Sequence, residues 1–309
     1  MATTLFTHPI CLEHDPGPGH PESRARLEAV LSGLEAETFS GLVHKEAPRA
    51  ALEQFTLVHD EIFVDKIFSA IPMKGYARLD PDTIVSPSSG EAALRAVGAV
   101  CAAVDEVLCG SASNAFCASR PPGHHAKPAS SMGFCLFNNV AIGAAHARQV
   151  YQLERVAVVD FDVHHGNGTQ SIFESDGNLF YASTHQSPSY PGTGNSNECG
   201  VAGNVVNVPL RPGDGSDEFR AAVTNTVLPK LRAFGPELLM ISAGFDAHRD
   251  DPLAQLNLET DDFTWITSRL MEVAAESCAG RVVSVLEGGY NIDALAAGVA
   301  AHVRTLMGS

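Results

Sequence analysis

One stretch of the sequence, 156–170, sets the strongest limit on the fold. It begins with four apolar residues, V-A-V-V, which predict a strand that is buried on both faces. The strand runs directly into Asp160, Asp162 and His164, which alternation along a strand would place on one face. Burying carboxylates and imidazoles away from water costs free energy, unless hydrogen bonds or an oppositely charged partner compensate that cost. The stretch therefore predicts a buried parallel strand with either a metal site or an ordinary polar loop at its end.

Short apolar runs alternate with longer helical patterns along most of the chain. The patterns predict strands at 4–12, 115–118, 156–159, 179–184, 237–242 and 281–286, and helices at 22–37, 91–108, 139–149, 216–233, 261–278 and 291–306. Residues 75–90 read as a polar loop, and the helix at 216–233 would be capped by its serine. This order predicts the α/β class, with one domain over residues 1–309 and a mostly parallel sheet that has helices on both faces.

The unusual polar loops all follow predicted strands. His124 and His125 come after the strand at 115–118, Asp246 after the strand at 237–242, and Tyr290 after the last strand. In open α/β sheets, ligands bind beyond the carboxyl ends of the strands. We therefore expect these loops to share one rim of the sheet and to form one active site.

A metal ion is predicted to bind Asp162, His164 and Asp246. A catalytic zinc usually takes three protein ligands and keeps one position open. Iron(II) and cobalt(II) accept the same oxygen and nitrogen donors, so the residues do not separate these metals.

Proton transfer is assigned to the adjacent histidines His124 and His125, although an H-H pair can also be an ordinary surface feature. One imidazole could take a proton from metal-bound water, and another could hand it to a leaving amine. Asp160 and Asn167 would orient the two rings. Tyr290, in E-G-G-Y, would donate a hydrogen bond to a developing oxyanion, with a core aromatic as the alternative.

The net charge of −16, from 36 acidic and 20 basic residues, disfavours nucleic acid as a direct partner. It favours cationic substrates such as lysine-rich peptides or polyamines, although solubility alone also explains an acidic surface. Seven cysteines without a C-x-x-C pair fit a reducing compartment. No signal peptide and no apolar stretch of about 20 residues is present, so the expected location is the cytoplasm, without a membrane.

Five motifs occur in an order that points to a known family. They are R-P-P-G-H-H-A, M-G-F-C-L-F-N-N-V-A, V-V-D-F-D-V-H-H-G-N-G-T-Q, S-A-G-F-D-A-H and L-E-G-G-Y. Together they resemble the histone deacetylase superfamily, and the G-N-G-T-Q run with Asn167 is closer to the class II branch and its bacterial deacetylase-like amidohydrolases. The resemblance covers nearly the whole chain. It implies an arginase/deacetylase fold that uses one zinc ion to hydrolyse an acetyl amide to acetate and a free amine.

The resemblance also implies a role for each matching residue. Asp162, His164 and Asp246 match the zinc ligands, and Asp160, Asp162, His164, Ser183 and Thr184 match a structural potassium site. His125 matches the general base and acid, His124 its electrostatic partner, and Asp160 and Asn167 the residues behind them. Tyr290 matches the carbonyl-polarising tyrosine, and because family members with little activity can carry histidine there, tyrosine predicts catalysis.

Substrate recognition is implied at four further positions. Gly133 and Phe134 match one wall of the acyl-lysine tunnel, and Tyr190 stands where the family usually has phenylalanine. Leu253 matches a position that gates substrate choice. An acidic residue there would favour acetylpolyamines, so leucine favours an acetyllysine-like substrate.

Several alternatives stay open. Asp80, Asp82 and Glu22 lie in other rim loops and could receive a cationic chain, which keeps an acetylpolyamine amidohydrolase as the second hypothesis. A weakly catalytic acyl-lysine binding module is the third, and the complete set of catalytic residues argues against it. A two-metal ureohydrolase would need D-x-H-x-D, whereas this chain has D-x-D-x-H. A homo-oligomer, in which a neighbouring subunit covers short rim loops, also stays open.

Overall fold

The computed structural model describes residues 2–308, and its centre is one sheet of eight strands. In spatial order these are β2 (Val43–Glu46), β1 (Thr3–Thr7), β5 (Asn114–Cys117), β10 (Val282–Leu286), β9 (Leu238–Ala243), β6 (Val156–Asp160), β7 (Leu179–Gln186) and β8 (Val205–Leu210). Every neighbouring pair is parallel. The carboxyl ends of all eight strands therefore lie along one edge of the sheet.

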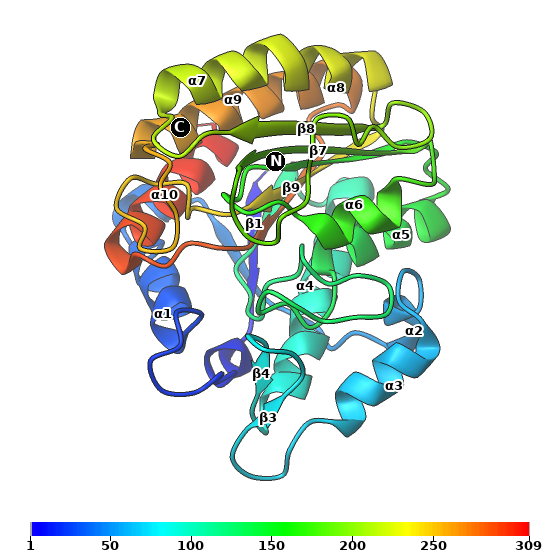
Figure 1. Ribbon diagram of the computed structural model, residues 1–309. Helices are drawn as coiled ribbons and strands as arrows, with labels where there is room; N and C mark the ends of the chain where they lie inside the picture. The colour runs from blue at the N-terminus through cyan, green and yellow to red at the C-terminus, as the bar shows by residue number, and fades with distance from the viewer. Residues whose placement is uncertain (1, 309) are drawn as a thin grey trace.

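Helices cover both faces of this sheet (Figure 1). One face packs against α1 (Arg24–Gly33), α7 (Ser216–Ala222), α8 (Leu228–Phe234), α9 (Thr260–Ser277) and α10 (Ile292–Leu306). The other face packs against α4 (Ser89–Leu108), α5 (Asn139–Tyr151) and α6 (Asn167–Phe173). The predicted fold class, an α/β sheet with helices on both faces, is confirmed.

Strand β6 shows why the sequence has an unbroken apolar run at this point. Val156 and Val158 belong to the core on the α4–α5 side, whereas Ala157 and Val159 belong to the core on the opposite side. All four side chains are buried. Because alternate side chains enter two different cores, the strand has no polar face.

A smaller layer lies outside α4. It contains α2 (Leu52–Phe55), α3 (Glu61–Ser69) and the antiparallel hairpin of β3 (Ala77–Arg78) and β4 (Ile84–Val85). Phe55 and Phe63 pack edge to face against Phe137 in a third apolar cluster. The segment predicted as a polar loop, 75–90, therefore contains a short hairpin, which lies at the bottom of Figure 1.

Some predicted boundaries were wrong. The first strand ends at Thr7, and Pro9–Leu12 forms a 3-10 helix because a proline has no N–H for a strand ladder. The helix predicted at 216–233 is interrupted by one π-helical segment, Val223–Val227. Ser216 does not cap that helix: Gly215 holds the capping position, and the Ser216 hydroxyl donates a hydrogen bond to Asp262 at 2.6 Å.

None of the helices within residues 2–308 is long and apolar enough to span a membrane.

Candidate active site

Five adjacent strands carry the loops of the candidate site. In the sheet they follow the order β5, β10, β9, β6 and β7. The loops after β5, β6, β9 and β10 contain the tandem histidines, Asp162 with His164, Asp246 and Tyr290, respectively. The loop after β7 contains Tyr190. The shared rim predicted from the order of motifs and strands is therefore present.

The three predicted metal ligands lie together. Asp162, His164 and Asp246 each offer a donor atom, and these atoms are all within 4.8 Å of one another. His164 Nδ1 is 3.2 Å from Asp162 Oδ1 and 3.0 Å from Asp246 Oδ2. Two ligands of a tetrahedral zinc, each about 2.0–2.1 Å from the ion, would be about 3.3 Å apart. The spacing and the oxygen–nitrogen–oxygen donor set therefore fit a zinc-sized cation.

The electrostatics of this cluster also favour a bound cation. Asp162 and Asp246 are fully buried. Burial would raise the pKa of Asp162, but the charge on His124 and the hydrogen bonds and charge of His164 lower it well below the ordinary value. Burial and then the charge on Asp162 raise the pKa of Asp246 to about 7. Two buried carboxylates this close are expensive to ionise together unless a cation compensates them.

Asp160 lies behind the cluster rather than in it, because the strand ends at this residue and the expected alternation stops there. Its Oδ2 accepts hydrogen bonds from His124 Nδ1 at 3.0 Å and from the Tyr181 hydroxyl at 3.1 Å. Its Oδ1 accepts from the Asp162 N–H at 3.1 Å. Asp160 therefore orients both His124 and the backbone of a proposed metal ligand, which is the position expected of it.

The residues matched to a potassium site come from two paired strands. Asp160 of β6 pairs in register with Ser183 of β7, and Thr184 is the next residue along β7. The Ser183 hydroxyl already forms a hydrogen bond with His185 Nδ1 at 2.9 Å. The potassium site stays a prediction.

The tandem histidines differ in their surroundings. His125 Nδ1 donates a hydrogen bond to Asn167 Oδ1 at 2.8 Å, which leaves its Nε2 lone pair free to accept a proton. Burial, and then the charges on His124 and His164, lower the pKa of His125 well below its usual value. Burial opposes protonation of His124 as well, but the charges on Asp162 and Asp160 raise its pKa well above the usual value. His125 is therefore neutral near pH 7, with the Nε2 lone pair available for a proton, and a cationic His124 lies beside it.

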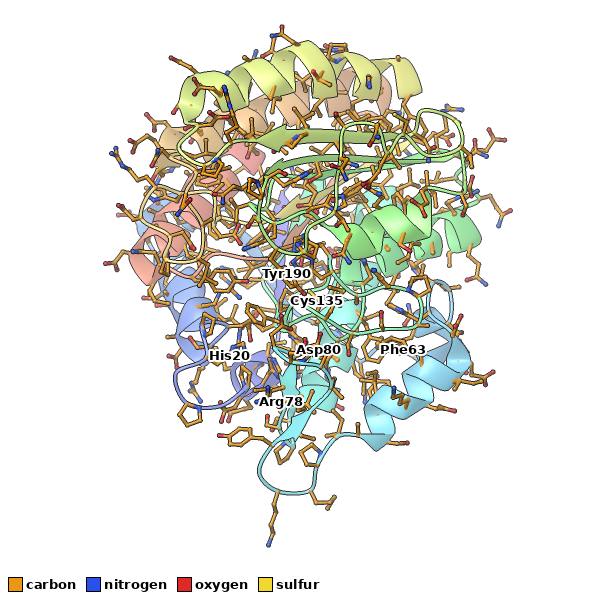
Figure 2. All side chains as sticks on the ribbon, in the orientation of Figure 1. His20, Phe63, Arg78, Asp80, Cys135 and Tyr190 are labelled. Carbon is orange, nitrogen blue, oxygen red and sulfur yellow. The ribbon has the colours of Figure 1, made fainter. Side chains whose placement is uncertain are left out.

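A cavity of about 180 Å³ leads to these groups. Its lining residues are Asp82, His125, Gly133, Phe134, His164, Tyr190, Leu253 and Tyr290. All four predicted substrate-binding residues are in this set. Figure 2 shows Tyr190 on the loop after β7, above Asp80 of the hairpin segment.

Glycine is required at position 133, where the cavity wall lies against the His125 ring. Its φ is +57°, and a Cβ built on it would lie 2.4 Å from Cδ2 of the His125 ring. The next residue, Phe134, also has a positive φ of 67°. Only glycine lets the backbone pass this close to His125, so the M-G-F motif shapes the cavity beside the base.

His165, which has no predicted catalytic role, lies outside the cavity. Its Nδ1 is 2.7 Å from the Thr193 hydroxyl, and its Nε2 is 2.8 Å from Gln170 Oε1. Burial lowers the pKa of His165 to about 4, so the ring is neutral near pH 7. The residue ties the loop that carries Tyr190 to α6.

Arg26 was missed by the sequence reasoning. This residue of α1 is fully buried, and its Nε donates to the carbonyl oxygen of Gly289 at 2.6 Å. Its guanidinium also lies 4.9 Å from the centre of the Tyr290 ring. The available signal was its spacing: Arg26, Val30 and Leu34 are four residues apart on the inner side of the helix.

Glu22 does not face the substrate, which corrects the expectation that it could receive a cationic chain. Its side chain is 0% exposed. Glu22 Oε1 accepts from Arg26 Nη1 at 3.0 Å, and Glu22 Oε2 accepts from Arg120 Nη2 at 2.7 Å. Burial would raise the pKa of Glu22, but the charge and hydrogen bonds of Arg120, followed by the charges on His14 and Arg26, lower it to about 2. The Glu22 carboxylate therefore pairs with two buried arginines at once.

We expect Glu22→Gln to destabilise the protein by about 3–5 kcal/mol, because it leaves buried guanidinium groups without their carboxylate. The folded pKa of about 2 is below the ordinary value of 4.5. The stabilisation is therefore complete above about pH 4.5 and is lost as the pH falls towards 2. Urea unfolding at several pH values measures this, with Glu28→Gln, in an exposed ion pair of α1, as control. Equal stability of wild type and Glu22→Gln at pH 7 would contradict the assignment.

The chain is similar to known proteins over most of its length. The model of the histone deacetylase domain matches residues 20–306. An uncharacterized protein from Synechocystis is 41% identical, over 96% of each chain. A histone deacetylase-like amidohydrolase from Pseudomonas aeruginosa is 38% identical, over 94% of this chain and 82% of that protein. The crystal structure of the HDA15 HD domain superposes with a TM-score of 0.94 and 34% identity, over 100% of this chain and 89% of that one.

Proposed function

The chain belongs to the histone deacetylase family, and we propose that it is a zinc-dependent deacylase that hydrolyses an acetyllysine-like amide to a free amine and acetate. One observation carries the proposal. Asp162 and Asp246 converge on His164, and His164 lines a cavity together with His125 and Tyr290. We further propose that residues 1–309 form one deacetylase domain.

Asp162, His164 and Asp246 would hold the zinc ion. The donor atoms and their spacing fit a zinc ion, and iron(II) would accept the same donors. The chemistry that bound zinc supplies is polarisation of the amide carbonyl and activation of a water molecule. Structural potassium beside Asp160 and Ser183 is part of the same proposal.

His125 would act as general base and then as general acid. Its Nε2 takes a proton from the water molecule as the oxygen attacks the carbonyl carbon. The same proton then passes to the amine nitrogen, the C–N bond breaks, and acetate and the free amine leave. Asn167 holds the His125 ring through Nδ1, and the buried carboxylate of Asp160 offsets the positive charge of the neighbouring His124.

Tyr290 would donate a hydrogen bond to the carbonyl oxygen as it gains negative charge. Burial raises the pKa of the Tyr290 hydroxyl well above its usual value, and the charges on Asp246 and Asp162 raise it further, against the opposing charge of Arg26. The hydroxyl therefore keeps its proton at neutral pH. A donor that cannot ionise is suited to this role.

The substrate is proposed to be an acylated lysine side chain or a similar amine. Leu253 lines the cavity and brings no charge to it. Asp82 lines the same cavity, and this observation keeps an acetylpolyamine amidohydrolase as the second candidate. A binding module with little catalysis is disfavoured because His125 and Tyr290 line the cavity and three residues beside it could hold a metal ion. No direct nucleic-acid or membrane partner is proposed, and a homo-oligomer stays a prediction.

For location we propose the cytoplasm. All seven cysteines are free thiols, and Cys11, Cys101, Cys117, Cys135 and Cys278 are buried. Free thiols are typical of proteins that work in a reducing compartment.

We expect a higher kcat/KM for an acetyllysine peptide than for acetylated putrescine or spermidine, because Leu253 offers no anion to a second ammonium. Asp82→Asn keeps the oxygen that accepts from the Gly133 N–H at 3.0 Å but removes the charge. We therefore expect this variant to lose more activity on acetylpolyamines than on a neutral acetyllysine peptide. Measured kcat/KM values for each substrate test both statements. A large excess for the polyamines would favour the second candidate.

A further inference from the structure

Asp251 is a buried carboxylate that no predicted role explains. It lies in the loop after β9, five residues beyond Asp246, and is 6% exposed. It takes part in no ion pair among residues 2–308. Instead, backbone groups satisfy it: Oδ2 accepts from the Tyr290 N–H at 2.7 Å, and Oδ1 accepts from the Leu253 N–H at 2.9 Å. A buried carboxylate that is bonded only to backbone N–H groups acts mainly by fixing the position of the residues that carry those groups.

The two backbone groups belong to residues that line the candidate-site cavity and come from the loops after two neighbouring strands. Leu253 is in the loop after β9, and Tyr290 is in the loop after β10. Each is bonded to a different oxygen of one rigid, planar carboxylate. Asp251 therefore fixes the distance between the proposed substrate gate and the proposed oxyanion donor.

The segment that carries Tyr290 needs an anchor of this kind. Gly288 and Gly289 precede it, so this part of the chain has no side chains of its own to restrict it. Arg26 holds the carbonyl oxygen of Gly289 from the side of α1. Asp251 holds the N–H of Tyr290 from the other side, and its Oδ2 also lies 3.3 Å from the N–H of Asn291, the N-cap of α10.

We propose that Asp251 is a positioning residue that couples Leu253 to Tyr290, so that the gate and the oxyanion donor move only as one unit. The inference rests on the proposed function, in which Tyr290 polarises the carbonyl and Leu253 contacts the substrate. It predicts that one change at Asp251 alters both the rate of the chemical step and the choice of substrate.

Asp251→Asn is the main test. The amide keeps one acceptor oxygen and turns an N–H₂ group towards the donors that the second oxygen held, so one of the two anchors is lost. We expect kcat on an acetyllysine peptide to fall by about 10- to 100-fold. We also expect the ratio of kcat/KM between the peptide and acetylputrescine to change. Zinc per chain and the urea unfolding midpoint are measured on the same samples, to separate positioning from a general loss of structure.

Two further variants make the test specific. Asp250→Asn is the matched control, because this neighbouring carboxylate is 63% exposed and does not contact Tyr290 or Leu253 through its side chain. It should retain wild-type rate and selectivity. Asp251→Glu keeps both acceptor oxygens, so it should recover part of the activity that Asp251→Asn loses. If the Asp251→Asn protein does not fold, Asp251→Glu takes its place in the test.

A double-mutant cycle decides whether Asp251 acts through Tyr290. If it does, Asp251→Asn should lower kcat by less than about threefold in a Tyr290→Phe background, because the Tyr290 hydroxyl that Asp251 positions is already absent. Independent, multiplicative losses would overturn the proposal, as would full activity or an unchanged substrate ratio in Asp251→Asn. Failure of the proposed function gives a different result, namely a wild-type protein that releases no acetate.

Discussion

Tyr290→Phe lowers kcat on an acetyllysine peptide by about 10²- to 10³-fold and leaves the zinc content unchanged. The phenol is the only side-chain donor assigned to the carbonyl oxygen, and burial keeps it protonated by raising its pKa. Phenylalanine removes the hydroxyl but keeps the ring, whose centre lies 5.9 Å from that of Phe134 in the cavity wall. The loss should therefore appear mainly in kcat rather than in KM, because the interaction is made in the transition state.

Steady-state kinetics, with zinc measured on each preparation, test this expectation. Tyr151→Phe is the matched control, because it removes a phenol at the end of α5 that is bonded to Asp105, outside the cavity. It should have wild-type kinetics. A Tyr290→Phe enzyme with wild-type kcat would show that another group polarises the carbonyl.

Asp246→Ala should reduce both bound zinc and activity. It removes one of three donors and leaves His164 and Asp162 to hold the ion alone. The loss in activity at limiting zinc should exceed the roughly 10- to 100-fold that removal of an outer-sphere partner typically costs. The same substitution removes the acceptor of the Val163 N–H, at 2.8 Å, so the loop after β6 also loses an anchor.

Elemental analysis of zinc per chain is the measurement for Asp246→Ala. Asp250→Ala, four residues further along the same loop and largely exposed, should bind zinc like the wild type. Unchanged zinc in Asp246→Ala would remove this residue from the ligand set and with it the proposed arrangement of the site.

The central strands could be predicted from the sequence, but the edges of the sheet could not. Strands β6, β9 and β10 each contain only one polar residue and are followed by polar loops, so the sequence indicates both the strands and the candidate site. Strand β2 is V-H-K-E, with all four residues exposed, and lacks any apolar pattern. Strand β8 contains Pro209, which an edge strand tolerates and a pattern search reads as a break.

Helix α6 was missed for a different reason. It begins N-G-T-Q, and a glycine in the first turn argues against a helix. A Cβ on Gly168 would lie 2.2 Å from the carbonyl oxygen of Ala126, in the loop that carries the tandem histidines. The close approach of two chain segments therefore requires glycine at position 168, although glycine has a low helix propensity.

Within the candidate site, too, some residues could be predicted from the sequence and others could not. The clustering of the proposed metal ligands and the tandem histidines could be predicted, because side chains of these types seldom follow buried strands without a function. Arg26 and Asp251 could not, since their partners are the carbonyl oxygen of Gly289 and the N–H groups of Tyr290 and Leu253. Backbone groups are the same at every position, so only the folded chain shows which side chains bind them.

The most direct test of the account is a zinc titration of metal-free wild-type protein, followed by the acetate released from an acetyllysine peptide. We expect no release without metal, and an activity that rises with added zinc and levels off at one zinc per chain. Release that persists after complete removal of metal, or no release at one zinc per chain, would contradict it.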